Sequence, residues 1–201
     1  MCIRDRLEAL KERLKGATRV LVVGCGTCTT VSKVGGEKEA KELASLLKLS
    51  LSGGKKPVKI TTVVVKRQCE PEFLDELKKK VMESDVVVSL GCGAGVQLIA
   101  EKYPTATVIP GLNTKFIGAV DKDYVLREFC SGCGDCVLDL TFGLCPRTRC
   151  AKSLLNGPCG GVHDGMCEVA DVPCVWVLIY KKAKRLRKLD VFLNVRMPRV
   201  N

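Results

Sequence analysis

The chain has 201 residues, of which 46% are hydrophobic and 27% are charged, and its formal net charge is +11. This length leaves room for one core domain and a small appendage, and the hydrophobic fraction excludes a disordered protein. No stretch approaches the roughly 18 apolar residues of a membrane span. We see no signal peptide, so we expect a cytoplasmic protein without a membrane partner. Met1–Arg6 precede the first helical pattern and resemble a cloning scar, so we do not count Cys2 among the candidate metal ligands.

Strands and helices are expected to alternate along the first part of the chain. Apolar periodicity predicts helices over 7–14, about 36–52, 71–82 and around 96–100, and strands over 18–23, 58–65, 85–90 and 106–109. Such alternation is typical of βαβ units, so we predict an α/β fold with a small, Rossmann-like parallel sheet. We assign residues 1–122 to this domain. Residues 123–201 then form a cysteine-rich, loop-dominated module with a C-terminal helix.

Each of the first three predicted strands runs into a loop that contains cysteine. Cys25 and Cys28 follow the first strand, Cys69 the second and Cys92 the third. Because parallel strands end at the same sheet edge, we expect these side chains to converge there. Four cysteines are the ligand number of a [4Fe-4S] cluster. The glycines beside them do not complete the G-x-G-x-x-G pattern of dinucleotide sites, since Thr29 and Val96 stand where its third glycine would be. Inert buried cysteines remain the alternative.

A second group of cysteines occupies the later part of the chain. Eight of the thirteen fall there: Cys130, Cys133, Cys136, Cys145, Cys150, Cys159, Cys167 and Cys174. Glycine and proline fill the gaps between them, so the segment buries little apolar surface and needs a metal to hold it. A disulfide framework is the weaker interpretation in a reducing cytoplasm.

Cys130, Cys133 and Cys136 have the C-x2-C-x2-C spacing of a bacterial ferredoxin run, and Cys145-Pro146 supplies its ending. The last gap is eight residues here, whereas the ferredoxin pattern has three. We therefore expect a second [4Fe-4S] cluster whose fourth ligand stays open among the five later cysteines. The remaining thiols could hold Zn2+, in place of the cluster or beside it. His163, the only histidine, is read as a surface residue, with metal ligation as the alternative.

The predicted C-terminal helix, from about Trp176 to Leu189, has an apolar stripe and a strongly basic opposite face. That face is either simply solvated or docks an acidic partner. Two [4Fe-4S] clusters, each with a net charge of roughly −2, would offset about a third of the formal excess, so nucleic acid is not expected as a partner.

These motifs together resemble one family. They are GCGTC at 24–28, RQCE at 67–70, CGAG at 92–95, the 130–136 run, CPRTRCAKSLLNGPCGG at 145–161 and GMCE at 165–168. The combination is similar to the small iron–sulfur subunit of acetogen-type methylenetetrahydrofolate reductase, also described as a methylenetetrahydrofolate reductase C-terminal (zinc-binding) domain. Residues 156–168 are the most specific part of this resemblance.

The resemblance implies a separate flavin-containing, TIM-barrel partner that reduces 5,10-methylenetetrahydrofolate to 5-methyltetrahydrofolate in one-carbon metabolism. This chain would bring electrons to that flavin, with a further electron-donor protein upstream. No residue stands out as a nucleophile or general acid, so we do not expect catalysis by the chain alone. The alternative is a zinc-stabilised basic module that binds protein or nucleic acid without a redox role.

Overall fold

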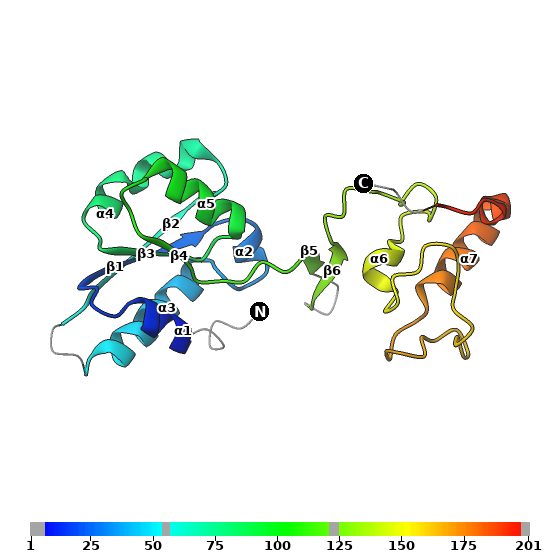
Figure 1. Cartoon of the computed structure of the whole chain (residues 1–201), viewed down its shortest axis with the longest axis horizontal. Helices are drawn as coiled ribbons and strands as arrows, with labels where there is room; N and C mark the ends of the chain where they lie inside the picture. Colours follow the sequence, from blue (N-terminus) through cyan, green and yellow to red (C-terminus); the bar gives the residue numbers. More distant parts are fainter. Residues whose placement is uncertain (1–6, 54–56, 121–124, 198–201) are drawn as a thin grey trace. The chain divides into compact units, whose positions relative to one another are not determined.

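The computed structural model describes residues 7–53, 57–120 and 125–197. Met1–Arg6 and Cys2 lie outside these ranges. The chain divides into two compact units, residues 1–114 and 115–201, and each has its own arrangement of elements (Figure 1). None of the helices within the described ranges is long and apolar enough to cross a membrane.

The first unit is built on a four-stranded parallel sheet. Its strands are β1 (Arg19–Cys25), β2 (Lys59–Val65), β3 (Val86–Ser89) and β4 (Val108–Pro110), in the order β2-β1-β3-β4. All three neighbouring pairs are parallel. The central strands β1 and β3 are almost fully buried, as expected for strands covered on both faces. This arrangement confirms the predicted α/β fold.

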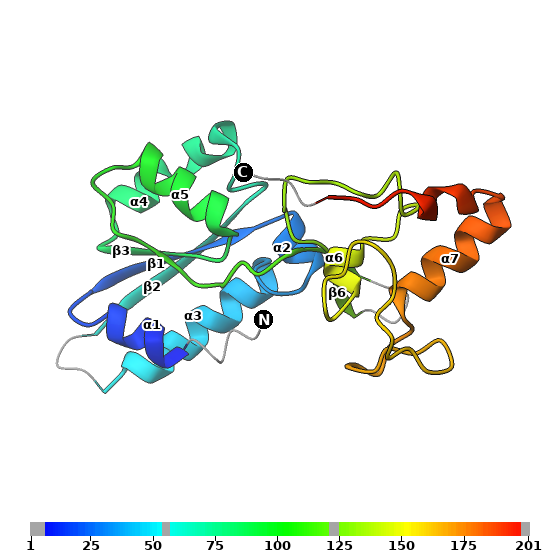
Figure 2. The ribbon, with the colours of Figure 1, turned by 45° about the vertical axis from the view of Figure 1, so that its right-hand side comes forward.

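Helices cover both faces of this sheet (Figures 1 and 2). The helical elements are α1 (Leu7–Arg13), α2 (Cys28–Val31), α3 (Glu37–Leu51), η2 (Pro71–Leu77), α4 (Lys78–Met82) and α5 (Gly93–Lys102). Alternate β1 residues point to opposite faces, so Val20 and Val22 pack with α1 and α3, whereas Leu21 and Val23 pack with η2, α4 and α5. The helix predicted over 71–82 proved to be a 3-10 helix in its first half and an α-helix only from Lys78.

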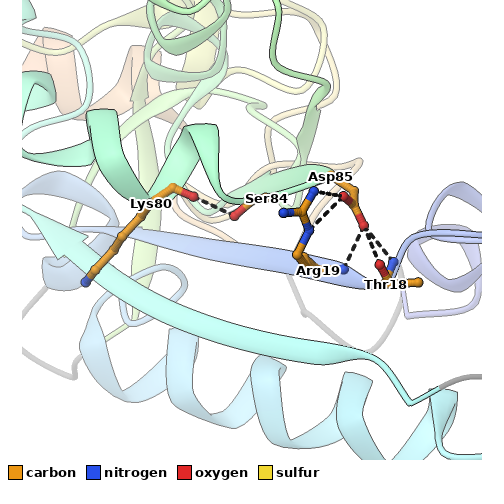
Figure 3. Close-up of polar contacts among 5 residues, drawn as sticks. All are labelled: Thr18, Arg19, Lys80, Ser84 and Asp85. Carbon is orange, nitrogen blue, oxygen red and sulfur yellow. Dashed lines mark hydrogen bonds and ion pairs between the residues drawn. The ribbon is translucent and has the colours of Figure 1, made fainter.

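One carboxylate ties the starts of two neighbouring strands together (Figure 3). Asp85 Oδ2 accepts hydrogen bonds from the Thr18 amide (2.8 Å), the Thr18 hydroxyl (2.9 Å) and the Arg19 amide (2.9 Å). Asp85 Oδ1 pairs with the Arg19 guanidinium at 2.6 Å. These contacts, with the Arg19 side chain first, hold the pKa of Asp85 well below its usual range. They fix the register of β1 against β3, and so the positions of the loops at the opposite edge.

The second unit has few regular elements. An antiparallel hairpin, β5 (Ile117–Val120) and β6 (Leu126–Cys130), leads into cysteine-rich loops interrupted by α6 (Pro146–Arg149). The helix α7 (Val175–Leu186) and η3 (Leu189–Leu193) follow. Trp176 anchors the small core, since it is 5% exposed and its Nε1 donates to Leu154 O at 3.0 Å. This arrangement confirms the predicted cysteine-rich loops and C-terminal helix.

The C-terminal helix is shorter than its apolar stripe. It ends at Arg187, whose left-handed φ of 56° breaks the helical path. Ile179 and Ala183 are buried, but Tyr180 and Leu186 are about half exposed, at 49% and 50%. The stripe therefore only partly faces the core of the second unit.

Candidate metal centres

The first four predicted ligands sit at the carboxyl edge of the parallel sheet. Cys25 is the last residue of β1, and Cys28 is the first of α2. Cys69 follows β2 and precedes η2, while Cys92 is the N-cap of α5. The fold thus delivers cysteines to the ends of three neighbouring strands and to helix starts, where backbone amides favour negative charge.

Cys25 is the buried member of this group, at 3% exposure. Burial alone would raise the pKa of its thiol. Hydrogen bonds from the backbone of Gln68 and of Thr27, with the hydroxyls of Thr27 and Thr29, outweigh burial and lower that pKa. The Thr27 hydroxyl lies 3.6 Å from the Cys25 sulfur. The site therefore already stabilises a thiolate, which is the form that ligates a metal.

Cys69 shows the opposite behaviour. Burial raises the pKa of its thiol, and the negative charges of the Cys92, Cys25 and Cys28 thiolates raise it further. The ionised form of Cys69 is therefore disfavoured by its cysteine neighbours. A bound cation would relieve the repulsion, as metals do for thiolate ligands.

The thiols are gathered but not closed into a coordination shell. In residues 7–53, 57–120 and 125–197, no group of three or more His, Cys, Asp or Glu side chains has a geometry that could hold a metal ion. The ligand assignments therefore remain predictions.

Gln68 forms hydrogen bonds at the same edge of the sheet, and the sequence analysis did not predict a role for it. It is 1% exposed, and its Nε2 donates to Val23 O at 2.9 Å. Its Oε1 accepts from Ser89 Oγ at 2.6 Å. The side chain of Gln68, the residue before Cys69, thus links the ends of β1 and β3. The R-Q-C-E motif included this residue, but a single sequence offers no signal that a loop glutamine would be buried.

Two glycines make room for Gln68. A Cβ on Gly91 would lie 2.4 Å from Gln68 Oε1, and one on Gly95 would lie 2.7 Å from Gln68 Cβ. Gly93, between them, is different: its Cβ would meet only Thr114 Oγ1, at 3.8 Å. A side chain at Gly93, next to Cys92 in the chain, would therefore displace no neighbouring atom.

In the second unit, Cys130 ends β6, Cys133 and Cys136 follow in the next loop, and all three are exposed. Gly132 and Gly134, with φ of +66° and +71°, let the loop turn back between the cysteines. The Gly132 amide lies 3.4 Å from the Cys130 sulfur. Such amide contacts to sulfur are also found around iron–sulfur clusters.

Asp135 anchors this loop. It is 7% exposed and pairs with Arg147 at 2.9 Å and with Arg196. Arg147 belongs to α6, whose N-cap is Cys145 and whose C-cap is Cys150. The Thr148 hydroxyl also donates to Phe129 O, at 3.3 Å. These contacts bring α6, and with it both Cys145 and Cys150, to the segment that holds the first three cysteines.

The other four cysteines line a small cavity in the second unit. Cys150, Cys159, Cys167 and Cys174 all line one small cavity, of about 10 Å³, together with Arg149 and Lys152. The Cys159 thiol lies 3.3 Å from Glu168 Oε1, and Glu168 also pairs with Lys152. The His163 side chain is 90% exposed beside Asp164, as its surface interpretation expects, and does not line this cavity.

A larger cavity, of about 250 Å³, lies elsewhere in the second unit. Trp176, Phe192 and Arg196 are among its lining residues, and no cysteine is. The larger cavity of this unit is therefore not the one that the cysteines line.

The fold and the two groups of cysteines define a class of protein: an α/β unit followed by a cysteine-rich module. Residues 109–201 match the family model described as "Methylene-tetrahydrofolate reductase C terminal". This match relates the cysteine-rich part of the chain to methylenetetrahydrofolate reductase and suggests association with that enzyme. No curated protein matches the chain, and no solved structure does.

Proposed function

We propose that the chain is an iron–sulfur electron-transfer subunit that delivers electrons to a flavin-carrying methylenetetrahydrofolate reductase. One [4Fe-4S] cluster is held at the sheet edge by Cys25, Cys28, Cys69 and Cys92. A second begins from Cys130, Cys133 and Cys136, with Cys145 as the fourth ligand, because Cys145-Pro146 has the ferredoxin ending and α6, which Cys145 caps, is bonded to that loop. The family match of residues 109–201 supports the choice of partner.

The observation that carries the proposal is the placement of Cys25, Cys28, Cys69 and Cys92 at or directly after the carboxyl ends of three neighbouring parallel strands. The four cysteines lie at or directly after the ends of three separate strands, and none of them forms a disulfide. A structural role for these cysteines in packing alone would not need Cys28 and Cys69, which are exposed. Four convergent thiolates beside backbone amides are what a cluster requires.

In this role, the chain's own residues would bind the clusters and adjust their reduction potentials. Each cluster accepts and releases one electron, so two clusters supply the two electrons that reduce a flavin, while the protons come from water. The conversion of 5,10-methylenetetrahydrofolate to 5-methyltetrahydrofolate then takes place on the partner.

Flavin reduction in the assembled complex tests this function. We expect Cys133→Ala to abolish reduction of the partner's flavin by an external donor while the α/β unit stays folded. Ser131→Ala, in the same loop but without a thiol, is the matched control and should behave as wild type. Unchanged flavin reduction by the Cys133→Ala complex would refute the proposal. Colourless protein holding only zinc would instead favour a basic binding module.

A further inference from the structure

We propose that the cavity of about 250 Å³ in the second unit is the docking site for the flavin-carrying reductase. The cavity receives one large apolar side chain from an acidic segment of that partner, and the basic end of α7 binds the acidic residues around it. The identity of the partner rests on the proposed function, whereas the surface and its chemistry follow from the contacts of the second unit.

The cavity is bordered by an apolar stretch of surface. Its walls come from the segment around Leu140, the start of α7 at Trp176, and residues 191–196. Six large apolar side chains between 186 and 197 are 38% to 83% exposed: Leu186, Leu189, Phe192, Leu193, Val195 and Met197. Of these, Phe192 and Val195 also line the cavity. Exposed apolar surface of this kind, next to a concavity, is typical of a protein-binding site.

The size of the cavity favours a side chain over a small molecule. Pockets for cofactors and drug-sized ligands usually have about 300–1,000 Å³, which is more than this cavity offers. A large apolar or aromatic side chain that fills a well-packed pocket is instead the usual anchor of a protein interface. We therefore assign the cavity to an anchoring side chain of the partner.

The wall formed by residues 194–196 is held in place by side-chain contacts. Asn156 Oδ1 accepts a hydrogen bond from the Arg196 amide at 2.8 Å, and Asn156 Nδ2 donates one to Arg196 O at 2.9 Å. The Arg196 side chain also pairs with the buried Asp135. Val195, which is 74% exposed, is thus presented from a fixed backbone. A site that is ordered before binding loses less conformational entropy when the partner docks.

The end of α7 next to this wall is strongly basic. Six side chains there are exposed, and none of them forms an ion pair with a residue of the described ranges: Lys181, Lys182, Lys184, Arg185, Arg187 and Lys188. The centroids of the Tyr180 and Phe192 rings lie 6.2 Å apart, which joins α7 to the cavity wall. Lys184 follows Tyr180 by one turn on the same side of the helix. After α7 the chain turns and runs back through η3 (Figure 2). Carboxylates around the anchoring side chain would therefore meet lysine and arginine at its rim.

Two other occupants fit these contacts less well. A second copy of the chain, docked symmetrically, would bring its own basic segment against the first, and like charges across an interface are costly. An anionic membrane would need the apolar face of α7. Trp176, Ile179 and Ala183 of that face are already buried. An acidic protein segment is thus the occupant that both the cavity and the charge favour.

Binding of the full chain to the reductase, measured by titration calorimetry at several salt concentrations, tests the site. We expect Val195→Glu to weaken binding by at least about tenfold, since it places a charge at the wall of the apolar cavity. Lys184→Glu combined with Lys188→Glu should weaken binding by about tenfold at low salt, and the difference should shrink as salt rises. These two lysines are exposed, so the second variant does not disturb the cavity wall.

Matched controls lie in the first unit. Leu49→Glu, on α3, changes an apolar side chain that is 74% exposed, as Val195 is. Lys79→Glu combined with Lys80→Glu reverses two exposed charges on α4. Both controls should bind the reductase as wild type does.

The outcomes separate this site from the electron-transfer role. A complex that Val195→Glu and the Lys184→Glu/Lys188→Glu variant leave unchanged would overturn the site and leave the proposed function intact. Wild-type chain that lacks iron, yet binds the reductase through these residues, would refute electron transfer and support the site. Wild-type chain that does not bind the reductase would overturn both. Self-association of the chain, or its binding to phosphatidylserine vesicles, would also overturn the site if Val195→Glu abolished either one while binding to the reductase persisted.

Discussion

Ser89 Oγ donates a hydrogen bond of 2.6 Å to the side-chain oxygen of Gln68 in the buried edge of the sheet. This bond joins the end of β3 to the loop after β2, and the same glutamine reaches β1 through Val23 O. The three strand ends that carry cysteines are therefore fixed relative to one another by one side chain.

Replacement of Gln68 tests that organising role. Gln68→Ala leaves the Val23 carbonyl and the Ser89 hydroxyl without their partner, so we expect the α/β unit to lose about 2–4 kcal/mol of unfolding free energy. Gln97→Ala is the control, since Gln97 is exposed and bonds only within its own helix, to Gly93 O at 3.1 Å. Chemical denaturation measures both variants, and equal losses in the two would contradict the account.

Glycines that face Gln68 should tolerate no side chain. Gly95→Ala places a methyl group 2.7 Å from Gln68 Cβ, and we expect it to destabilise the unit by about 1–3 kcal/mol. Gly93→Ala meets only Thr114 Oγ1 at 3.8 Å and should change stability by less than about 1 kcal/mol. Thermal unfolding of the two variants in the metal-free protein compares them. A greater loss in Gly93→Ala would show that the packing around Gln68 is wrongly described.

The Asp85 cluster should make folding sensitive to acid. The pKa of Asp85 in the folded protein is lowered from an unfolded value of about 3.9. The group therefore stabilises the fold fully above that value, and the contribution is lost as pH falls below it. Asp85→Asn should be less stable than wild type at pH 7, with the difference shrinking toward pH 3. Asp75→Asn is the control, since the Asp75 side chain pairs with Lys102 but is itself 77% exposed, and it should show little change at either pH.

Asp135 should be essential to the loop of Cys130, Cys133 and Cys136. Asp135→Ala removes the carboxylate that pairs with Arg147 and Arg196, whose side chains are only 28% and 23% exposed. We expect a loss of about 2–4 kcal/mol, reduced from the full cost of breaking a buried pair by the remaining exposure of the arginines. Asp139→Ala, at an exposed position nearby, should be near neutral. Protease resistance of the second unit measures the effect, and equal resistance in both variants would count against it.

The sequence predicted the sheet correctly because an unbroken apolar run such as residues 20–23 indicates a strand buried on both faces. Parallel topology then placed Cys25, Cys69 and Cys92 at one edge. The hairpin strand β5 was missed because its residues are mostly exposed and show no alternation. Gln68 was missed because its partners lie 45 and 21 positions away, and only the fold brings them to it.

The surroundings of the later cysteines could not be predicted for a related reason. Spacing alone left Cys145 and Cys174 equivalent as candidates for the second cluster. In the structure, Arg147 of α6, the helix that Cys145 caps, bonds to Asp135, while Cys174 lines a small cavity with Cys150, Cys159 and Cys167. These contacts join residues that are far apart in the sequence, so spacing alone could not predict them.

Iron content tests the central claim most directly. The chain purified without oxygen should contain about eight iron atoms and about eight inorganic sulfides, and Cys69→Ser should retain about four of each. Ser45→Ala, on the exposed side of α3, should keep all eight. Wild-type protein without iron, or Cys69→Ser protein with its full iron content, would contradict a cluster at the edge of the sheet.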